Sequence, residues 1–326
     1  MEETLSNGAR RQLRRQLAAY FLATFAISWG IFGSALALGL ARSPVVILGV
    51  WGPTLSAIIV TAMFYGRDGL KRFFGRIDAA KGLRWFLPLL GFFLVIGLAG
   101  HFIGAAAAGI EFDPKFWGWA WVAQVMVMQL LIPGFGEEFG WRGFALQRLQ
   151  YLMSPFKATL VIAFFHLLWH APTYWLGQGM HNVPAIWAVC FLLPWTILFT
   201  WAYNKSKGSI LVSVFFHATM GATLSYTAFL PGEKAVPLSP DLITMAWLPD
   251  GLMGPYLGVA ALYWVLALYV LSGGFGGLGT PPAFEHPIDE RDEKGAVAAQ
   301  VAMMRRNAHR EPRATTSSLD EQGAFD

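Results

Sequence analysis

Charged residues are scarce in this sequence of 326 residues, since only 13% are Asp, Glu, Lys or Arg. This is about half the share in a soluble domain, so a water-soluble fold of this length would lack the charge to cover its surface. Hydrophobic residues make up 55% of the chain and aromatic residues 15%, which excludes disorder for most of it. The composition therefore predicts a polytopic membrane protein.

Cysteine is almost absent, and the single Cys190 excludes an intramolecular disulfide. Its apolar surroundings favour a small packing residue over a reactive thiol. The net charge of +4 is too small to suggest a nucleic-acid partner. The sequence also lacks a glycine-rich phosphate loop, an H-E-x-x-H motif and a G-x-S-x-G motif, so these three kinds of catalytic site are not indicated.

Apolar stretches of the length that crosses a bilayer are abundant, because about 20 residues span roughly 30 Å of hydrocarbon. We expect eight helical spans, at 17–40, 44–65, 84–108, 117–136, 157–175, 184–203, 208–230 and 255–276. The predicted fold class is therefore all-α. The predicted organisation is a basic N-terminal arm over 1–16, a transmembrane domain over 17–276, a loop over 231–254 and a disordered tail over 277–326.

Lysine and arginine are distributed unevenly about these spans. One side of the predicted membrane domain holds 21 of the 24, and the opposite loops hold only Arg42, Lys115 and Lys234. Basic residues near membrane helices stay in the cytoplasm, so this side is predicted to be cytoplasmic and to carry both termini. That arrangement requires an even number of spans, which eight satisfies.

Two adjacent carboxylates, Glu137 and Glu138, end the fourth predicted span, although charges within a membrane are costly and usually serve a function. Arg142 follows Glu138 by four residues, so on a helix these two side chains share a face and can pair. Glu137 lies about 100° around the helix and has no partner nearby in the sequence. The spacing predicts one neutralised carboxylate and one left for proton transfer. The alternative is a purely structural pair of interfacial acids balanced by Arg142.

Three histidines fall within later predicted spans. His166 and His170 are four residues apart and share one face of the fifth span, and His217 lies inside the seventh. A lone intramembrane histidine is more often a hydrogen-bonded packing residue, and we interpret His101 in the third span in this way. Three imidazoles together with an unpaired glutamate point instead to hydrolysis, because a neutral ring can accept a proton, bind a metal or donate to an oxyanion.

With these residues, the segment over about 130–225 resembles the CAAX protease and bacteriocin-processing family, also called ABI proteins, which includes the Ras-converting prenyl endopeptidases. The family's first motif, E-E-x-x-x-R, is present as Glu137, Glu138 and Arg142. The residues around it also resemble bacterial members. The family core is expected over about 117–230.

The second and third motifs are present with one departure each. His170 matches the histidine of F-x-x-x-H, while His166 stands where the phenylalanine is expected. His217 matches the histidine of H-x-x-x-Asn or Asp, while Gly221 occupies its last position. If an asparagine there donates to the oxyanion, glycine removes a donor whose loss typically costs about 100- to 1,000-fold in rate. His166 or a water could then supply the missing contact.

The resemblance implies an intramembrane endopeptidase in an eight-helix fold. It implies that Glu137 is the general base that activates water and that Glu138 is held by Arg142. His170 is expected to help position the water, and His217 to contact the oxyanion or a metal. The implied substrate is a membrane-associated or prenylated peptide, and the implied location is a bacterial plasma membrane.

The resemblance leaves the cofactor open. Glu137, His170 and His217 would make a plausible zinc triad with an open fourth position. A purely glutamate-driven reaction fits the same residues.

Two functions without catalysis are also open. The chain could be a bacteriocin-immunity or peptide-binding membrane factor that holds a peptide without cutting it, which the departure at Gly221 would suit. It could also be a proton-coupled transporter in which Glu137 and the histidines relay protons. The transporter is less favoured because it predicts repeats between the two halves of the chain, and the sequence contains none.

Overall fold

The computed structural model describes residues 7–111, 119–176, 183–224, 243–244, 246–247 and 253–282, with the backbone alone at 119–122 and 223–224. Across these residues the chain is helical and has no strand, which confirms the all-α prediction. The predicted tail beyond residue 282 and most of the loop predicted at 231–254 lie outside the described residues.

The helices follow one another with short connections. The first part of the chain forms α1 (Asn7–Ala37), α2 (Val45–Val50), α3 (Gly52–Gly75), α4 (Ala79–Ala108), α5 (Trp119–Gln129), α6 (Phe135–Gly140) and α7 (Gln147–Leu152). The second part forms α8 (Pro155–Trp175), α9 (Ala188–Lys205), α10 (Ile210–Leu224) and α11 (Met253–Leu271). Helical residues thus occur in each of the eight predicted segments. Helix α1 begins at Asn7, within the predicted N-terminal arm, and so it starts earlier than the first span expected from residue 17.

Four helical segments are long and apolar enough to cross a membrane, by length and composition: α1, α4, Ala185–Lys205 and α11. Apolar side chains on their outer faces are largely exposed, with Leu22 at 73%, Leu87 at 70% and Val265 at 63%. Apolar surface of this kind is unfavourable in water and is suited to lipid. The chain is an integral membrane protein. The number of eight crossings stays a prediction.

Helix starts follow local chemistry where the connections are polar. Asp78 precedes α4, and its side chain accepts a hydrogen bond from the Lys81 backbone N–H at 3.0 Å. This bond and the neighbouring ammonium group lower the pKa of Asp78 below its ordinary value. Ser154 precedes α8, accepts from the Lys157 N–H and is followed by Pro155 in the first turn. Both are N-terminal caps that satisfy an otherwise unpaired backbone donor.

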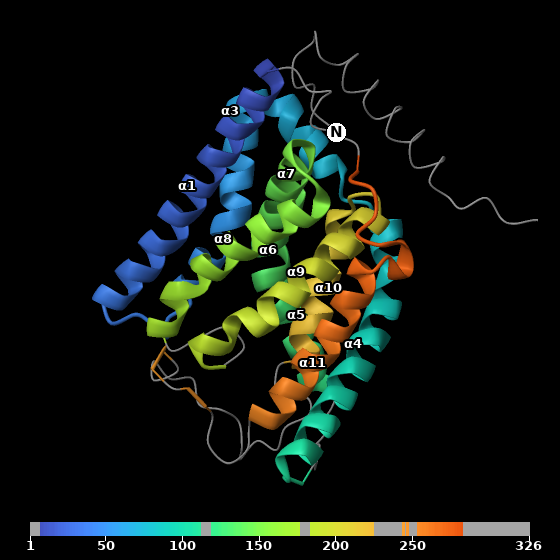
Figure 1. Ribbon diagram of the computed structural model, residues 1–326. Coiled ribbons are helices and arrows are strands. Elements are labelled where there is room, and N and C mark those ends of the chain that lie inside the picture. The colour runs from blue at the N-terminus through green and yellow to red at the C-terminus, as the bar shows by residue number, and fades with distance from the viewer. Residues whose placement is uncertain are drawn as a thin grey trace, which may run out of the picture.

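Two apolar clusters hold the bundle together. The first is formed mainly by α4, α9, α10 and α11, and Phe93, Phe216 and Tyr263 are fully or almost fully buried in it. The second is formed mainly by α1, α3, the segment from α6 to α7, and α8. Helix α10 contributes to both, through Phe216 in the first and Val214 in the second. Figure 1 shows α6, α8 and α10 in the middle of the molecule, where the two clusters meet.

The segment that carries the two carboxylates departs from regular α-helix on both sides. A π-helical turn, Leu130–Gly134, precedes α6, and a second, Trp141–Leu146, follows it. Pro133 lies in the first turn and has no N–H to give to a carbonyl four residues back. The wider turn pairs groups five residues apart instead, as the Phe135 N–H does with the Leu130 carbonyl. Such turns frequently accompany functional sites.

Glycine allows α6 to approach α1 and α3 closely. A Cβ added at Gly140 would lie 2.5 Å from the backbone of Pro53 and 2.6 Å from the hydroxyl of Tyr20. We therefore expect Gly140→Ala to lower the free energy of unfolding by about 1–3 kcal/mol, the usual cost of overpacking. Gly91→Ala in α4 is the matched control, because nothing lies within 4 Å of its added Cβ. Thermal unfolding in detergent should separate the two variants, and equal melting temperatures would contradict this packing.

Candidate active site

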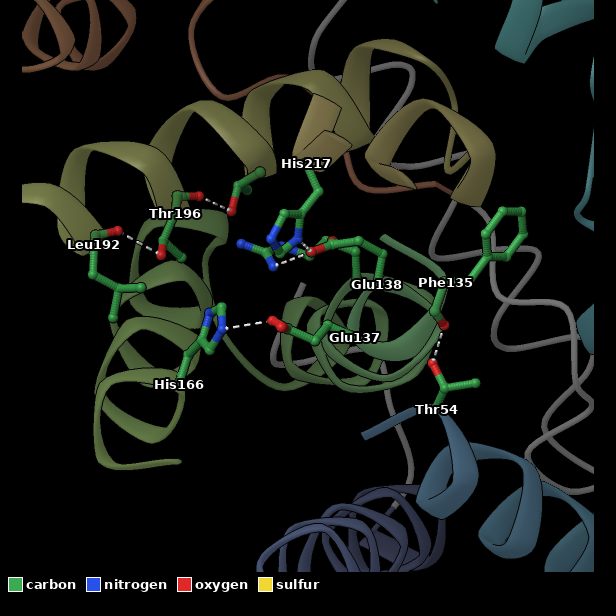
Figure 2. A network of polar contacts seen from close by, with 10 residues as sticks. Thr54, Phe135, Glu137, Glu138, His166, Leu192, Thr196 and His217 are labelled. Carbon is green, nitrogen blue, oxygen red and sulfur yellow. Dashed lines mark hydrogen bonds and ion pairs between the residues drawn. The ribbon is translucent and has the colours of Figure 1, made fainter. Parts of the chain in front are cut away.

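The carboxylate of Glu138, the second of the pair, contacts two basic side chains. Arg142 Nη1 donates to Glu138 Oε1 at 2.9 Å, so the pair predicted from the i,i+4 spacing is present. His217 Nδ1 lies 2.8 Å from the same oxygen, as the dashed lines in Figure 2 show. Glu138 is 0% exposed and Arg142 1% exposed. A buried pair of this kind fixes the position of both side chains, since neither can move without leaving an uncompensated charge.

The guanidinium of Arg142 also contacts an aromatic ring. Its Cζ atom lies 3.8 Å from the ring centroid of Phe199 on α9, at the distance of a cation–π interaction. The same ring lies 5.6 Å from that of His217. Arg142 thus ties the helix of the carboxylates to α9 as well as to Glu138.

The first carboxylate has a different partner, from a different helix. Glu137 Oε2 lies 3.0 Å from His166 Nε2 on α8, and Figure 2 shows the two side chains pointing toward each other. Both are almost wholly buried, at 3% and 4% exposed. The sequence leaves Glu137 without a nearby partner, and the fold supplies one from 29 residues further along the chain. In the Nε2–H tautomer the neutral ring donates to the carboxylate and fixes its orientation.

His170 lies one turn further along α8. Its ring is stacked on that of His166, with centroids 5.0 Å apart and an angle of 26° between the planes. Two tryptophans enclose this pair: Trp141 is 4.9 Å from the His166 ring and Trp169 is 4.9 Å from the His170 ring, centroid to centroid. Their indoles are almost fully buried. The imidazoles are therefore held in fixed orientations by an aromatic wall.

Glu137 is the residue on which the remaining groups converge. Its ligand atom and those of His166 and His170 lie within 4.8 Å of one another, and so do those of Glu137, Glu138 and His217. The acid at 137 is thus close to the imidazoles on both α8 and α10. The zinc set expected from the resemblance, Glu137 with His170 and His217, is divided between these two groups. Carboxylate and imidazole donors suit a zinc ion in either case.

Comparison with known proteins matches this part of the chain to one family. Residues 119–223, which contain all of these side chains, match the family model described as type II CAAX prenyl endopeptidase Rce1-like. The chain is also 27% identical over 236 residues to CAAX prenyl protease 2 of Methanococcus maripaludis, an alignment that covers 67% of this chain and 87% of that protein. Over this segment the chain is similar to the Rce1-like CAAX endopeptidases. These similarities support a protease, with the candidate site described above as its active site.

The departure from the third family motif at Gly221 has a structural reason. A Cβ added at Gly221 would lie 2.4 Å from Oε1 and 2.8 Å from Cδ of Gln129. The carboxamide of Gln129 therefore occupies the space that a side chain at 221 would need. Gly221 is one turn beyond His217 on α10, so this carboxamide lies against the helix face that also carries His217.

Substitution of this glycine should displace the Gln129 side chain. We expect Gly221→Asn to lower the free energy of unfolding by about 1 kcal/mol, the lower end of the cost of overpacking, because the overlapping atoms are the end of the flexible Gln129 side chain. The double variant Gly221→Asn with Gln129→Ala should recover most of the loss, since the overlap is removed. Thermal unfolding of the two single variants and the double variant gives the coupling. Additive effects would show that Gln129 does not fill this space.

Sequence reasoning missed Gln129, Trp141 and Trp169. Trp141 lies between the motif residues Glu138 and Arg142, and Trp169 directly precedes His170, so aromatic residues adjacent to motif residues were the available signal. The interpretation of His101 as a packing residue is confirmed, because it is 2% exposed and its Nδ1 lies 2.7 Å from the Gly97 carbonyl.

Proposed function

We propose that this endopeptidase hydrolyses a peptide bond of a membrane-associated or prenylated peptide, with Glu137 as the general base. The observation that carries the proposal is the difference between the two adjacent acids. Glu138 is engaged by Arg142 and His217, at 2.9 Å and 2.8 Å, and is wholly buried. Glu137 is hydrogen-bonded to His166 and lies beside His170. Of the two acids, Glu137 is the one that can turn from its hydrogen bond toward an incoming water without breaking an ion pair with Arg142.

In this reaction a water molecule lies between Glu137 and His170. The carboxylate of Glu137 takes one proton from the water as its oxygen attacks the carbonyl carbon of the peptide. The carbonyl π electrons move to the oxygen, which becomes an oxyanion. When the tetrahedral intermediate collapses, the C–N bond breaks and Glu137 returns its proton to the departing nitrogen. His166 keeps the carboxylate in place through these two proton transfers.

His217 reaches the substrate through its second nitrogen. Its Nδ1 is engaged by Glu138, which in the neutral ring makes Nδ1 the protonated nitrogen. Nε2 is then the atom that faces the substrate, and it can donate to the oxyanion only when the ring carries both protons. Glu138 therefore acts by positioning His217. Arg142 acts by holding Glu138 and by its contact with Phe199 on α9.

A zinc ion is compatible with the same residues. If Glu137 and the imidazoles held it, it would supply Lewis-acid polarisation of a carbonyl or of water, and Glu137 would then be a ligand and not the base. The steps assigned above to Glu137, His166 and His217 are those of the protein's own side chains.

The substrate class follows from the surroundings of the site and from the relatives. Helices that face lipid enclose a polar centre, so a substrate that is itself held at the membrane can enter from the bilayer side. CAAX prenyl protease 2 of Methanococcus maripaludis is named for prenylated CAAX substrates, and we extend this substrate class to the present chain. We also propose the orientation predicted from the basic residues, with both termini in the cytoplasm.

Cleavage assays on the purified full chain test this proposal. Reconstituted protein is offered a panel of peptides that share one sequence and differ only in a farnesyl or geranylgeranyl group on the cysteine. Product peptides are identified by mass spectrometry. We expect cleavage of a lipidated peptide at a single bond, at a rate at least tenfold above that of the unmodified peptide. Binding of the peptides without any cleavage would contradict the proposal and favour a peptide-binding factor.

A further inference from the structure

We propose that the side-chain amide of Gln129 donates a hydrogen bond to the oxyanion formed during peptide cleavage, a role that Gly221 has no side chain to fill. The inference rests on the proposed function, in which the carbonyl oxygen of the peptide gains a negative charge. It assigns to α5 a catalytic residue that lies outside the three motifs.

The oxyanion needs a donor that the histidine on α10 does not supply in its neutral form. His217 Nδ1 lies 2.8 Å from Glu138 Oε1, so the neutral ring carries its proton on Nδ1 and leaves Nε2 as an acceptor. A carboxamide nitrogen carries two N–H groups and keeps them at any working pH. A glutamine beside His217 can therefore stabilise the oxyanion without a change of protonation.

The carboxamide of Gln129 lies on the side of α10 that carries this histidine. Its Cδ is 2.8 Å and its Nε2 is 3.4 Å from the point where a Cβ of residue 221 would lie, and its Oε1 is closer than either. Positions 217 and 221 are four residues apart and share one face of the helix. The carboxamide therefore packs with its oxygen against Gly221, and its nitrogen is the end further from that glycine.

The π-helical turn that follows Gln129 brings it onto the face of Glu137. The two residues are eight positions apart, which in a regular α-helix would place them about 80° apart around the axis. The turn Leu130–Gly134 takes one extra residue, so the separation corresponds to about seven α-helical positions, or nearly two full turns. Gln129 and Glu137 thus lie on the same side of the segment, about 10 Å apart along its axis. A peptide carbonyl attacked by the water at Glu137 can extend toward the amide.

The surroundings of Gln129 also suit a group that meets the substrate. The residues on either side are apolar, over 125–128 and 130–133. A polar side chain in such a segment of a membrane protein usually faces the protein interior and serves a function. Gln129 is half-buried, whereas Glu137 and Glu138 are buried, so its amide is the more accessible to a bound peptide.

Removal of this amide should slow cleavage and leave substrate binding unchanged. We expect Gln129→Ala to lower kcat for the lipidated peptide by about 100- to 1,000-fold, the usual cost of losing one oxyanion donor. KM should change little, because the donor acts on charge that develops only in the transition state. Gln124→Ala is the matched control, since Gln124 is an exposed glutamine on the same helix, and it should cleave at the wild-type rate. Thermal unfolding verifies that both variants are folded.

A carboxamide supplied from the other helix distinguishes donation from packing. The double variant Gln129→Ala with Gly221→Asn returns an amide to the vacated space, and we expect its kcat to be at least about tenfold above that of Gln129→Ala. The double variant Gln129→Ala with Gly221→Leu fills the same space without a donor and should stay as slow as Gln129→Ala. Equal recovery in the two double variants would overturn the assignment, because packing alone would then explain the effect.

A phosphinate analogue of the cleaved peptide gives a readout that needs no turnover by the variant. Its anionic oxygens imitate the oxyanion, so Gln129→Ala should weaken its binding by about the same factor as it lowers kcat. Unchanged binding of the phosphinate, or an unchanged kcat, would overturn the role of Gln129 and leave the proposed function intact. Wild-type protein that cleaves no peptide would overturn the proposed function, and this inference with it.

Discussion

Glu137→Gln should abolish peptide cleavage while leaving the protein folded. Glutamine has nearly the same shape and its carbonyl oxygen can still accept from His166, but it cannot take a proton from water. Loss of a general base typically costs about 100- to 10,000-fold in rate, and we expect a fall of at least about 1,000-fold in kcat for the lipidated peptide. KM should change little, because the carboxylate contacts the water and not the body of the substrate. Initial rates on reconstituted protein measure both constants.

The control for this variant is a glutamate outside the site. Glu111 is exposed in the segment that follows α4, and Glu111→Gln removes the same charge from the chain. The Glu111→Gln variant should cleave at the wild-type rate. A similar loss of cleavage in both variants would show that the effect comes from the net charge or from handling of the protein. More than a tenth of wild-type activity in Glu137→Gln would exclude Glu137 as the base.

Removal of Arg142 should have the largest effect on stability. Arg142→Met leaves Glu138 buried with its charge uncompensated by a guanidinium, and breaking a buried ion pair in this way costs about 3–5 kcal/mol. Cleavage should fall as well, because Glu138 is then no longer fixed by the guanidinium and its contact with His217 is free to shift. Thermal or denaturant unfolding in detergent measures the first effect, and the peptide assay measures the second.

A second variant distinguishes the charge from the packing of Arg142. The double variant Glu138→Gln with Arg142→Met contains neither charge, and glutamine can still accept from His217. We therefore expect it to recover a large part of the lost stability, because no uncompensated charge is left in the interior. If the double variant were as unstable as Arg142→Met alone, the contact of Arg142 with Phe199, and not the ion pair, would be the main contribution.

The features that sequence could predict are those that depend on local spacing. The hydrophobic stretches identified an α-helical membrane protein, and the four-residue separation identified the pairing of Glu138 with Arg142. His166 and His170 share a helix face as the same periodicity requires, and their rings are stacked. These relationships hold within one helix, so no knowledge of the fold is needed to infer them.

Contacts between helices could not be predicted in this way. Glu137 and His166 are 29 residues apart, and nothing in either segment indicates that they meet. The π-helical turns on both sides of α6 also shift the direction of every side chain after them, which a regular 100° rotation does not describe. The pairing of the base with a histidine on α8 depends on this tertiary arrangement.

Two arginines illustrate the same limit. Counting basic residues placed Arg76 and Arg148 in cytoplasmic segments, which suggests solvent exposure, but the structure buries both. Arg76 Nη1 donates to the Gly143 carbonyl at 2.5 Å, and Arg148 Nε donates to Gln16 Oε1 at 2.7 Å. Each ties the segment after the carboxylates to a distant helix. A charge count records which side a residue lies on and not whether it is buried.

The most direct test compares Glu137→Gln and Glu138→Gln in the same preparation, with cleavage rate and melting temperature measured on each. If Glu137 moves the proton and Glu138 holds the structure, Glu137→Gln should lose cleavage and keep its melting temperature, whereas Glu138→Gln should have a clearly lower melting temperature. The opposite pattern, with cleavage retained in Glu137→Gln and lost from a fully stable Glu138→Gln, would contradict the division of roles between the two acids.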